Sequence, residues 1–314
     1  MTVVLNIVGS VFLLIAVGYF SVRAGLFPAD GVKGLLEFIQ NFAVPCLLFQ
    51  AMTSVDLGAV FDPKYLFSFY CGAFITFVTA ILIAVSVFKR RPGEAIVVGF
   101  SAYFTNTVLV GLPIISRAYG EESLPLAYGI IGIHSPLLMT FGMLAMELFR
   151  RDGESLARTM AGACRRIMVN PMLIGIAVGL SINLSGLEVP GIIDSATQTM
   201  AAGVLPAALF GLGGALNQYR LLESWPQATI SSALKLVLHP LLVLLLSRYV
   251  FAIPWEMARI AVIMAAMPTG LSVYIFASYY NRATDIAANT LLISTAMSAL
   301  SVSGWLLALE RLGP

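Results

Sequence analysis

FTNTVLVGLP, residues 104–113, places an asparagine, a glycine and a proline within about two helical turns of an otherwise apolar run. The chain around it is 59% hydrophobic and 11% charged, which leaves too little polar surface to coat a soluble globule. We therefore place the stretch inside a lipid bilayer, where any break in helical hydrogen bonding must be covered by protein or by a wet cavity.

Apolar runs long enough to span the hydrocarbon core of a membrane follow one another along the whole chain. They cover residues 3–22, 34–54, 65–88, 95–117, 124–149, 168–184, 192–217, 228–250, 257–280 and 286–308. Continuous runs predict helices, because transmembrane strands alternate apolar and polar residues in short segments. We predict an all-α integral membrane protein with ten transmembrane helices.

Basic residues predict how these helices are oriented, because Lys and Arg are retained on the cytoplasmic side during insertion. Twelve of them fall in the connections after odd-numbered runs, against five on the opposite side. Both termini are therefore expected outside the cytoplasm. The first run has no Lys or Arg before it and no small-residue cleavage site after it, so we expect it to remain as a helix.

The most basic connection divides the chain near its middle. We predict two halves of five helices, residues 1–150 and 166–314, joined by a basic cytoplasmic loop at 151–165. An odd number of spans in each half inverts one half relative to the other.

A gapless offset of 161 residues supports an inverted repeat, because it lays residues 15–49 over residues 176–210. The matches include glycines and prolines, which apolar composition alone explains less well than aliphatic matches. Pro45 falls on Pro206 in this alignment.

Prolines also interrupt the fourth and ninth runs, the corresponding helices of the two halves. Inverted repeats with paired broken helices place a substrate site where the breaks meet, and a half-helix N-terminus there can bind an anion. We predict that the site is built from Asn106, Thr107, Gly111, Pro113, Pro268, Thr269, Gly270 and Ser272. The alternative is that the prolines only kink their helices and that Asn106 joins neighbouring helices by hydrogen bonds. Pro45 and Pro206 are interpreted as hinges or kinks.

Ionisable residues inside the spans are few, and each is a functional candidate. Lys235 and His239 lie four residues apart, hence on one helix face, where they could carry a coupling proton. In the alternative interpretation, Lys235 reaches towards a membrane surface and His239 only bonds within the bundle. His134 is a weaker coupling candidate, because a lone histidine is most often a satisfied core residue.

The remaining chemistry is sparse. Cys46, Cys71 and Cys164 form no disulfide framework or metal-ligand spacing, and we expect no metal and no cofactor. No nucleophile–base pair or metalloprotease motif is present in the sequence, which argues against an enzyme. No nucleic-acid partner is expected.

Several segments resemble, in order, the auxin efflux carrier family, which includes the PIN-FORMED carriers and bacterial carriers of the malonate type. They are PCLLF at 45–49, FTNTVLVGLPI at 104–114, KLVLHP at 235–240 and AAMPTGLSVYIFASYYN at 265–281. The resemblance implies a ten-helix fold related to the bile acid–sodium symporters, with the fourth and ninth helices crossing at their breaks. It also implies a scaffold of helices one, two, six and seven, with a homodimer through it, and a moving bundle of the other six.

By this resemblance, Asn106 lies at the crossing and contacts an organic carboxylate. Two departures matter. The ninth run lacks an asparagine symmetric to Asn106, and no long cytoplasmic loop separates the halves, which favours a carrier of the bacterial inner membrane with periplasmic termini. The membrane carboxylate of the sodium symporters is missing from the ninth run, which disfavours sodium coupling.

The sequence therefore predicts a secondary transporter that moves a small organic carboxylate across the lipid bilayer by alternating access, with a proton as the candidate coupling ion. The alternatives are a channel and a transporter-like membrane sensor, which would bind its ligand without coupled transport.

Overall fold

The computed structural model describes residues 2–55, 60–150, 165, 168–219 and 224–313. The helices of the first half are α1 (Thr2–Arg23), α2 (Ala29–Phe38), η1 (Ile39–Ala43), α3 (Val44–Ser54), α5 (Pro63–Ser86), α6 (Pro92–Tyr103), η2 (Thr107–Gly111), α7 (Leu112–Tyr119), η3 (Glu121–Ser123) and α8 (Leu124–Arg150). Most of the predicted loop at 151–165, including Cys164, lies outside the described residues.

The second half continues in the same way. Its helices are α10 (Pro171–Ser185), α11 (Gly191–Ala202), α12 (Val204–Leu216), α13 (Trp225–Ala233), η4 (Leu234–Leu238), α14 (His239–Leu245), η5 (Leu246–Val250), α15 (Trp255–Ala266), α16 (Ser272–Tyr280) and α17 (Thr284–Leu312). Within the described ranges there is no strand, only one isolated bridge, so the all-helical prediction is confirmed.

Seven helical stretches in the described part of the chain are long and apolar enough to cross a membrane. They are 6–23, 29–54, 63–86, 121–149, 191–216, 225–250 and 284–312. The three other predicted spans coincide with the interrupted pairs α6–α7 and α15–α16 and with the short helix α10. That these three also cross the membrane stays a prediction.

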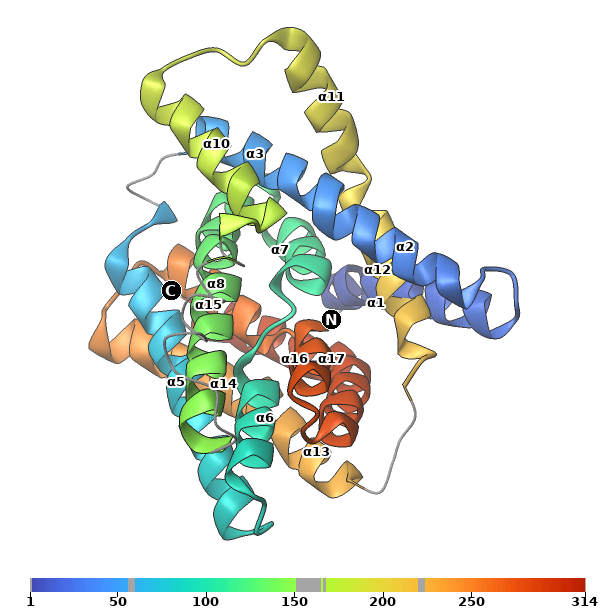
Figure 1. Ribbon diagram of the computed structural model, residues 1–314. Helices are drawn as coiled ribbons and strands as arrows, with labels where there is room; N and C mark the ends of the chain where they lie inside the picture. Colours follow the sequence, from blue (N-terminus) through green and yellow to red (C-terminus); the bar gives the residue numbers. More distant parts are fainter. Residues whose placement is uncertain (1, 56–59, 151–164, 166–167, 220–223, 314) are drawn as a thin grey trace.

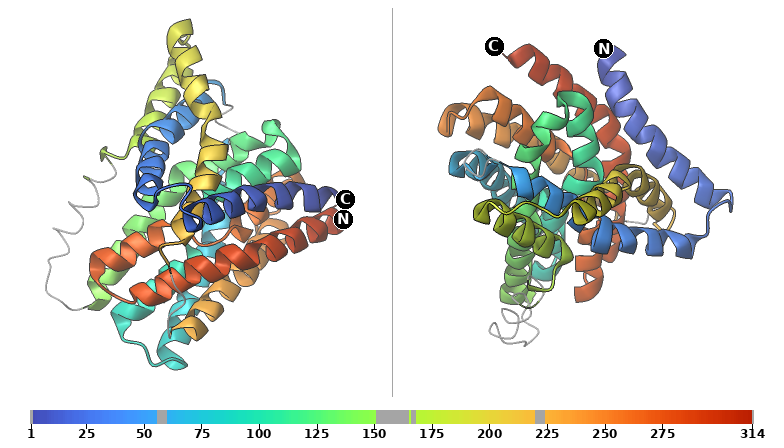
Figure 2. Two further views of the ribbon diagram at one scale, coloured as in Figure 1. Left: turned by 90° about the vertical axis from the view of Figure 1, so that its right-hand side faces the viewer. Right: turned by 90° about the horizontal axis from the view of Figure 1, so that it is seen from above.

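The helices lie in two groups (Figure 1). The helices α2, α3, α10 and α11 occupy the upper part of that view, whereas α5, α6, α8 and α13 form the lower part, with α7 between them. Both ends of the chain lie at the same end of the molecule in each view of Figure 2.

Glycines bring two pairs of helices into backbone contact. On α1, a Cβ added at Gly18 would lie 2.0 Å from the carbonyl oxygen of Phe210 on α12. On α10, a Cβ at Gly179 would lie 2.6 Å from the carbonyl oxygen of Phe49 on α3. Helices this close make extensive van der Waals contact, the main attraction between helices in lipid.

Three prolines share one local structure. Pro45, Pro113 and Pro240 each follow a π-helical turn, in η1, η2 and η4 respectively, and each is the second residue of the next α-helix. A π-turn changes the backbone bonding just where proline lacks an N–H and crowds the preceding turn. Pro206 lies instead in the first turn of α12, just after α11 ends at Ala202. A hinge role for Pro45 and Pro206 stays a prediction.

We predict that Gly18→Ala destabilises the protein, because its Cβ would overlap the carbonyl oxygen of Phe210. Overpacking of this kind typically costs about 1–3 kcal/mol. Gly9→Ala on the same helix is the matched control, since nothing lies within 4 Å of its Cβ position. Thermal unfolding of the purified variants in detergent, followed by tryptophan fluorescence, should show a lower melting temperature for Gly18→Ala alone. Equal melting temperatures would contradict the close contact of α1 and α12.

Candidate functional site

The two interrupted helices meet at their breaks. Between α6 and α7 the chain is extended at Phe104, and between α15 and α16 it is extended at Met267, whose backbone is restricted by the following Pro268. Thr105 and Thr269 form an isolated antiparallel bridge across the two breaks.

Backbone hydrogen bonds join the breaks directly. The Asn106 N–H donates to the Pro268 carbonyl at 2.8 Å, and the Gly270 N–H donates to the Phe104 carbonyl at 3.1 Å. Each break thereby satisfies groups that the other leaves open, which is what backbone buried away from water requires.

Neighbouring side chains satisfy more of this exposed backbone. His134 Nε2 accepts from the Thr105 N–H at 3.1 Å, and Ser294 Oγ accepts from the Thr269 N–H at 3.1 Å. The Thr269 hydroxyl donates to the Ser101 carbonyl at 2.8 Å. The crossing is therefore held by α8 and α17 as well as by the two broken helices themselves.

The first break lies before the position that the sequence suggested. We expected it at Gly111 and Pro113, but α6 ends at Tyr103 and the helix resumes at Thr107. The reason is that Asn106 caps the new helix, its Oδ1 accepting from the Leu109 N–H at 3.2 Å. Pro113 then occupies the first turn of α7, a position where proline is tolerated.

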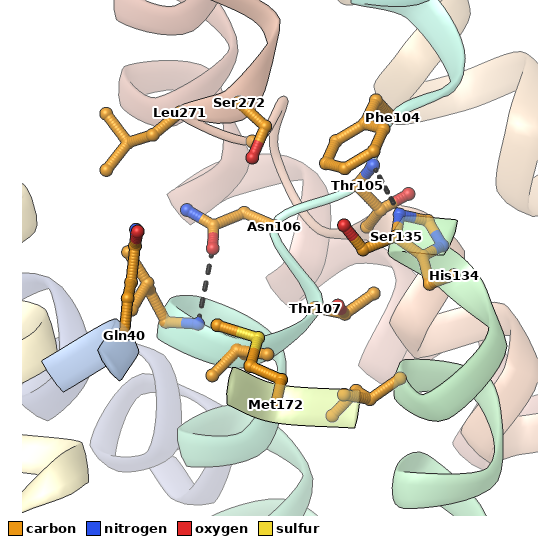
Figure 3. Close-up of a pocket in the computed structure, with 14 residues that line it drawn as sticks. Gln40, Phe104, Thr105, Asn106, Thr107, His134, Ser135, Met172, Leu271 and Ser272 are labelled. Atoms are coloured by element: carbon orange, nitrogen blue, oxygen red, sulfur yellow. Dashed lines mark hydrogen bonds between the residues drawn. The ribbon is translucent and has the colours of Figure 1, made fainter. Parts of the chain in front are cut away.

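A cavity of about 80 Å³ opens beside the crossing (Figure 3). One water molecule needs roughly 10–15 Å³ of cavity volume, so this cavity is large enough for several waters. It therefore has room for a small carboxylate. It is lined by Gln40, Phe104, Thr105, Asn106, Thr107, Val108, Leu109, Ile131, His134, Ser135, Met172, Gly270, Leu271 and Ser272.

Asn106 is the central polar group of this cavity. Its side-chain oxygen is engaged with Leu109, whereas its Nδ2 is buried and has no hydrogen-bond partner. Figure 3 shows the amide lying between Ser272 and Gln40. A buried donor without a partner is costly, so a ligand that accepts from Nδ2 would gain a hydrogen bond the protein does not make.

The structure brings some of the predicted site residues together and separates others. Asn106, Thr107, His134, Gly270 and Ser272 line the cavity. The remaining predicted site residues do not line it. Gly111 packs against Met264, with a Cβ position 3.0 Å from the sulfur, and Pro113, Pro268 and Thr269 are buried around the crossing.

Gln40, Ser135 and Met172 line the cavity but were not predicted. The sequence pattern could have indicated Gln40 and Ser135 as site candidates, because each is a polar residue inside an apolar run. It could not have indicated Met172, since only the packing of α10 against the site brings it there.

Lys235 and His239 lie next to the end of α15, just before the second break. Lys235 is fully buried, and its Nζ donates to the Ala265 carbonyl at 2.6 Å and lies 3.1 Å from His239 Nδ1. The interpretation of Lys235 as a residue that reaches the membrane surface is therefore wrong. Its Nζ instead contacts the C-terminal end of α15, where the last helix carbonyls have no partner within the helix.

A ring contact connects this pair to the cavity. The Phe69 ring lies 5.3 Å from the His239 ring and 5.8 Å from the His134 ring, measured between centroids. His134 Nδ1 and His239 Nε2 are buried without hydrogen-bond partners. Within the described residues, no three His, Cys, Asp or Glu side chains are grouped so that they could hold a metal ion.

We predict that Lys235→Met lowers the melting temperature, because it leaves the Ala265 carbonyl unpaired at the end of α15. An unsatisfied buried acceptor costs about 1–3 kcal/mol. Lys64→Met is the matched control, since Lys64 is exposed at the start of α5. If both variants melted alike, Lys235 would not hold the broken helix.

Comparison with known proteins identifies the family. Residues 3–306 match the family described as membrane transport protein. The "Putative malonate transporter" of Rhizobium meliloti (strain 1021) is 26% identical over 305 residues, which cover 96% of this chain and 94% of the relative. "Auxin efflux carrier component 8" of Arabidopsis thaliana is 25% identical over 329 residues, covering 88% and 89%.

A third relative is the "Lysosomal cholesterol signaling protein" of Mus musculus, 26% identical over 317 residues, covering 94% of this chain and 36% of the relative. The first two names denote carriers, which confirms that this is not an enzyme family. The resemblance inferred from the motifs is likewise confirmed. Matched over nearly its whole length, this multi-pass membrane protein belongs to the membrane transport protein family, together with auxin efflux carriers.

Proposed function

We propose that the protein is a secondary active transporter that moves a small organic carboxylate across the membrane by alternating access. The observation that supports this most is the unpaired amide of Asn106 in a cavity between two interlocked helix breaks. The name of the Rhizobium meliloti relative points to the same substrate class.

The cavity has the chemistry of an anion site. Its lining offers neutral donors, namely the amides of Asn106 and Gln40 and the hydroxyls of Thr107, Ser135 and Ser272, and no described Asp or Glu belongs to it. The helix that resumes at Thr107 points its N-terminus towards the cavity, which adds a positive potential. Neutral donors suit a carrier, because they bind an anion without holding it as tightly as a buried cation would.

We further propose that ten helices span the membrane as two inverted repeats. The close glycine contacts support this, because Gly18 against Phe210 and Gly179 against Phe49 are related by the same offset of 161 residues. The helices α1–α3 and α10–α12 would then form the scaffold. The helices α5–α8 and α13–α17 would form the moving bundle. Gln40 and Met172 would reach the site from the scaffold and the other lining residues from the bundle.

A proton is the coupling ion we propose, with Lys235, His239 and His134 as its carriers. Their arrangement supports this, because Lys235 contacts one broken helix and His134 the other. A change of charge on either group would alter the hydrogen bonds that hold the crossing.

The test of substrate binding is uptake of labelled malonate and other dicarboxylates into proteoliposomes. Asn106→Asp keeps an oxygen that can cap the Leu109 N–H but loses the Nδ2 donor and adds negative charge. Loss of a hydrogen bond to a charged ligand costs about 1.5–3 kcal/mol, so we expect uptake per amount of folded, reconstituted protein to fall by roughly tenfold or more.

Asn281→Asp is the matched control, because it adds the same charge at an exposed helix end. Undiminished uptake by Asn106→Asp would refute the site. Binding without flux would instead favour the sensor, and current that does not saturate with substrate would favour a channel.

The test of coupling is the response of uptake to an imposed proton gradient. We expect uptake by the native protein to become faster when the gradient is applied. His239→Gln keeps a polar side chain but has no titratable ring, so its uptake should not respond to the gradient. His239→Gln with an undiminished response would exclude His239 as a proton carrier.

A further inference from the structure

A second and larger cavity lies along the same seam between the two helix groups. Its volume is about 340 Å³, and its walls include Leu47 and Gln50 of α3, Leu112 of α7 and Tyr128 of α8. Gln198 and Ala201 of α11 complete the side opposite α7 and α8, and Glu121 of the short helix η3 also lines it.

The two cavities follow each other along shared helices. On α8, Ile131 lines the first cavity and Tyr128 the second, and on the resumed helix Leu109 lines the first and Leu112 the second. Three residues of helix correspond to about 4.5 Å, so the layer between the cavities is about one helical turn thick on these walls. Leu109 and Ile131 on the first cavity and Leu112 on the second are all apolar.

The second cavity is electronegative, in contrast to the first. Glu121 lines it, and the amides of Gln50 and Gln198 on its opposite wall both donate to Asp194, at 3.0 Å and 2.9 Å. Among the residues that the structure describes, no Lys or Arg lines it. Arg117, the nearest basic residue in sequence, donates instead to the Ser10 hydroxyl of α1 at 2.8 Å.

We propose that this second cavity is the opposite vestibule of the transport pathway, and that Glu121 makes it a charge filter that admits singly charged or protonated carboxylic acids in preference to dianions. The inference rests on the proposed function. A low-dielectric cleft of one charge sign concentrates solutes of opposite charge and repels those of like charge. A dicarboxylate that enters as its monoanion would bring a proton with it.

Cysteine labelling tests the vestibule without any substrate. In a background in which Cys46, Cys71 and Cys164 are replaced by alanine, Ala201→Cys would place a thiol on the cavity wall. Its labelling rate is measured with two membrane-impermeant methanethiosulfonates, one carrying a trimethylammonium group and the other a sulfonate. We expect labelling from one side of the membrane, faster with the cationic reagent.

Glu121→Gln should lower the cation-to-anion rate ratio by about threefold or more, as expected when a steering charge is removed. Glu122→Gln is the matched control, because Glu122 is exposed like Glu121 but does not line the cavity. No labelling at position 201, or a ratio that Glu121→Gln leaves unchanged, would overturn the proposal.

Uptake provides the second arm. Glu121→Gln should increase uptake of malonate relative to its monomethyl ester, measured at pH 8, where malonate is a dianion. A shifted labelling ratio with no carboxylate transport by the native protein would refute the proposed function instead, so the two failures are distinguishable.

Discussion

The architecture depends on one constraint, that polar backbone inside a bilayer must find a partner within the protein. Two helices are broken at the same place, and each supplies hydrogen bonds that the other lacks, through Asn106 N–H to Pro268 and Gly270 N–H to Phe104. Around this crossing, His134, Ser294 and Lys235 satisfy further backbone groups. Because the crossing is closed by such bonds, the unpaired Nδ2 of Asn106 is a donor that is available to a ligand in the cavity.

Different interactions hold the helices together in the two parts of the molecule, van der Waals contact in one and hydrogen bonds in the other. In the pairs α1–α12 and α10–α3, glycines allow backbones to touch, which favours a stiff body held by van der Waals contact. Around the crossing, buried serines, threonines and histidines hold the helices by hydrogen bonds. Cavities occur along the seam where these groups face each other, which is where relative movement of two rigid bodies would open and close a path.

The sequence predicted the all-helical membrane fold because composition and run length are local properties. It also predicts a role for Asn106, a polar amide in an apolar run, and the structure places this residue in the lining of the cavity. It misplaces the first break at Pro113, because proline is also tolerated in the first turn of a helix. The contacts of Lys235 with Ala265 and of Gln40 with the cavity depend on how distant helices pack, which no local pattern encodes.

We propose that the crossing binds an organic carboxylate through Asn106. Anomalous diffraction from crystals grown with bromomalonate tests it most directly, because bromine marks the ligand independently of the protein density. We predict an anomalous peak in the cavity beside Asn106 and Ser272. A bromine site elsewhere, with this cavity empty in a protein that still transports malonate, would contradict the account.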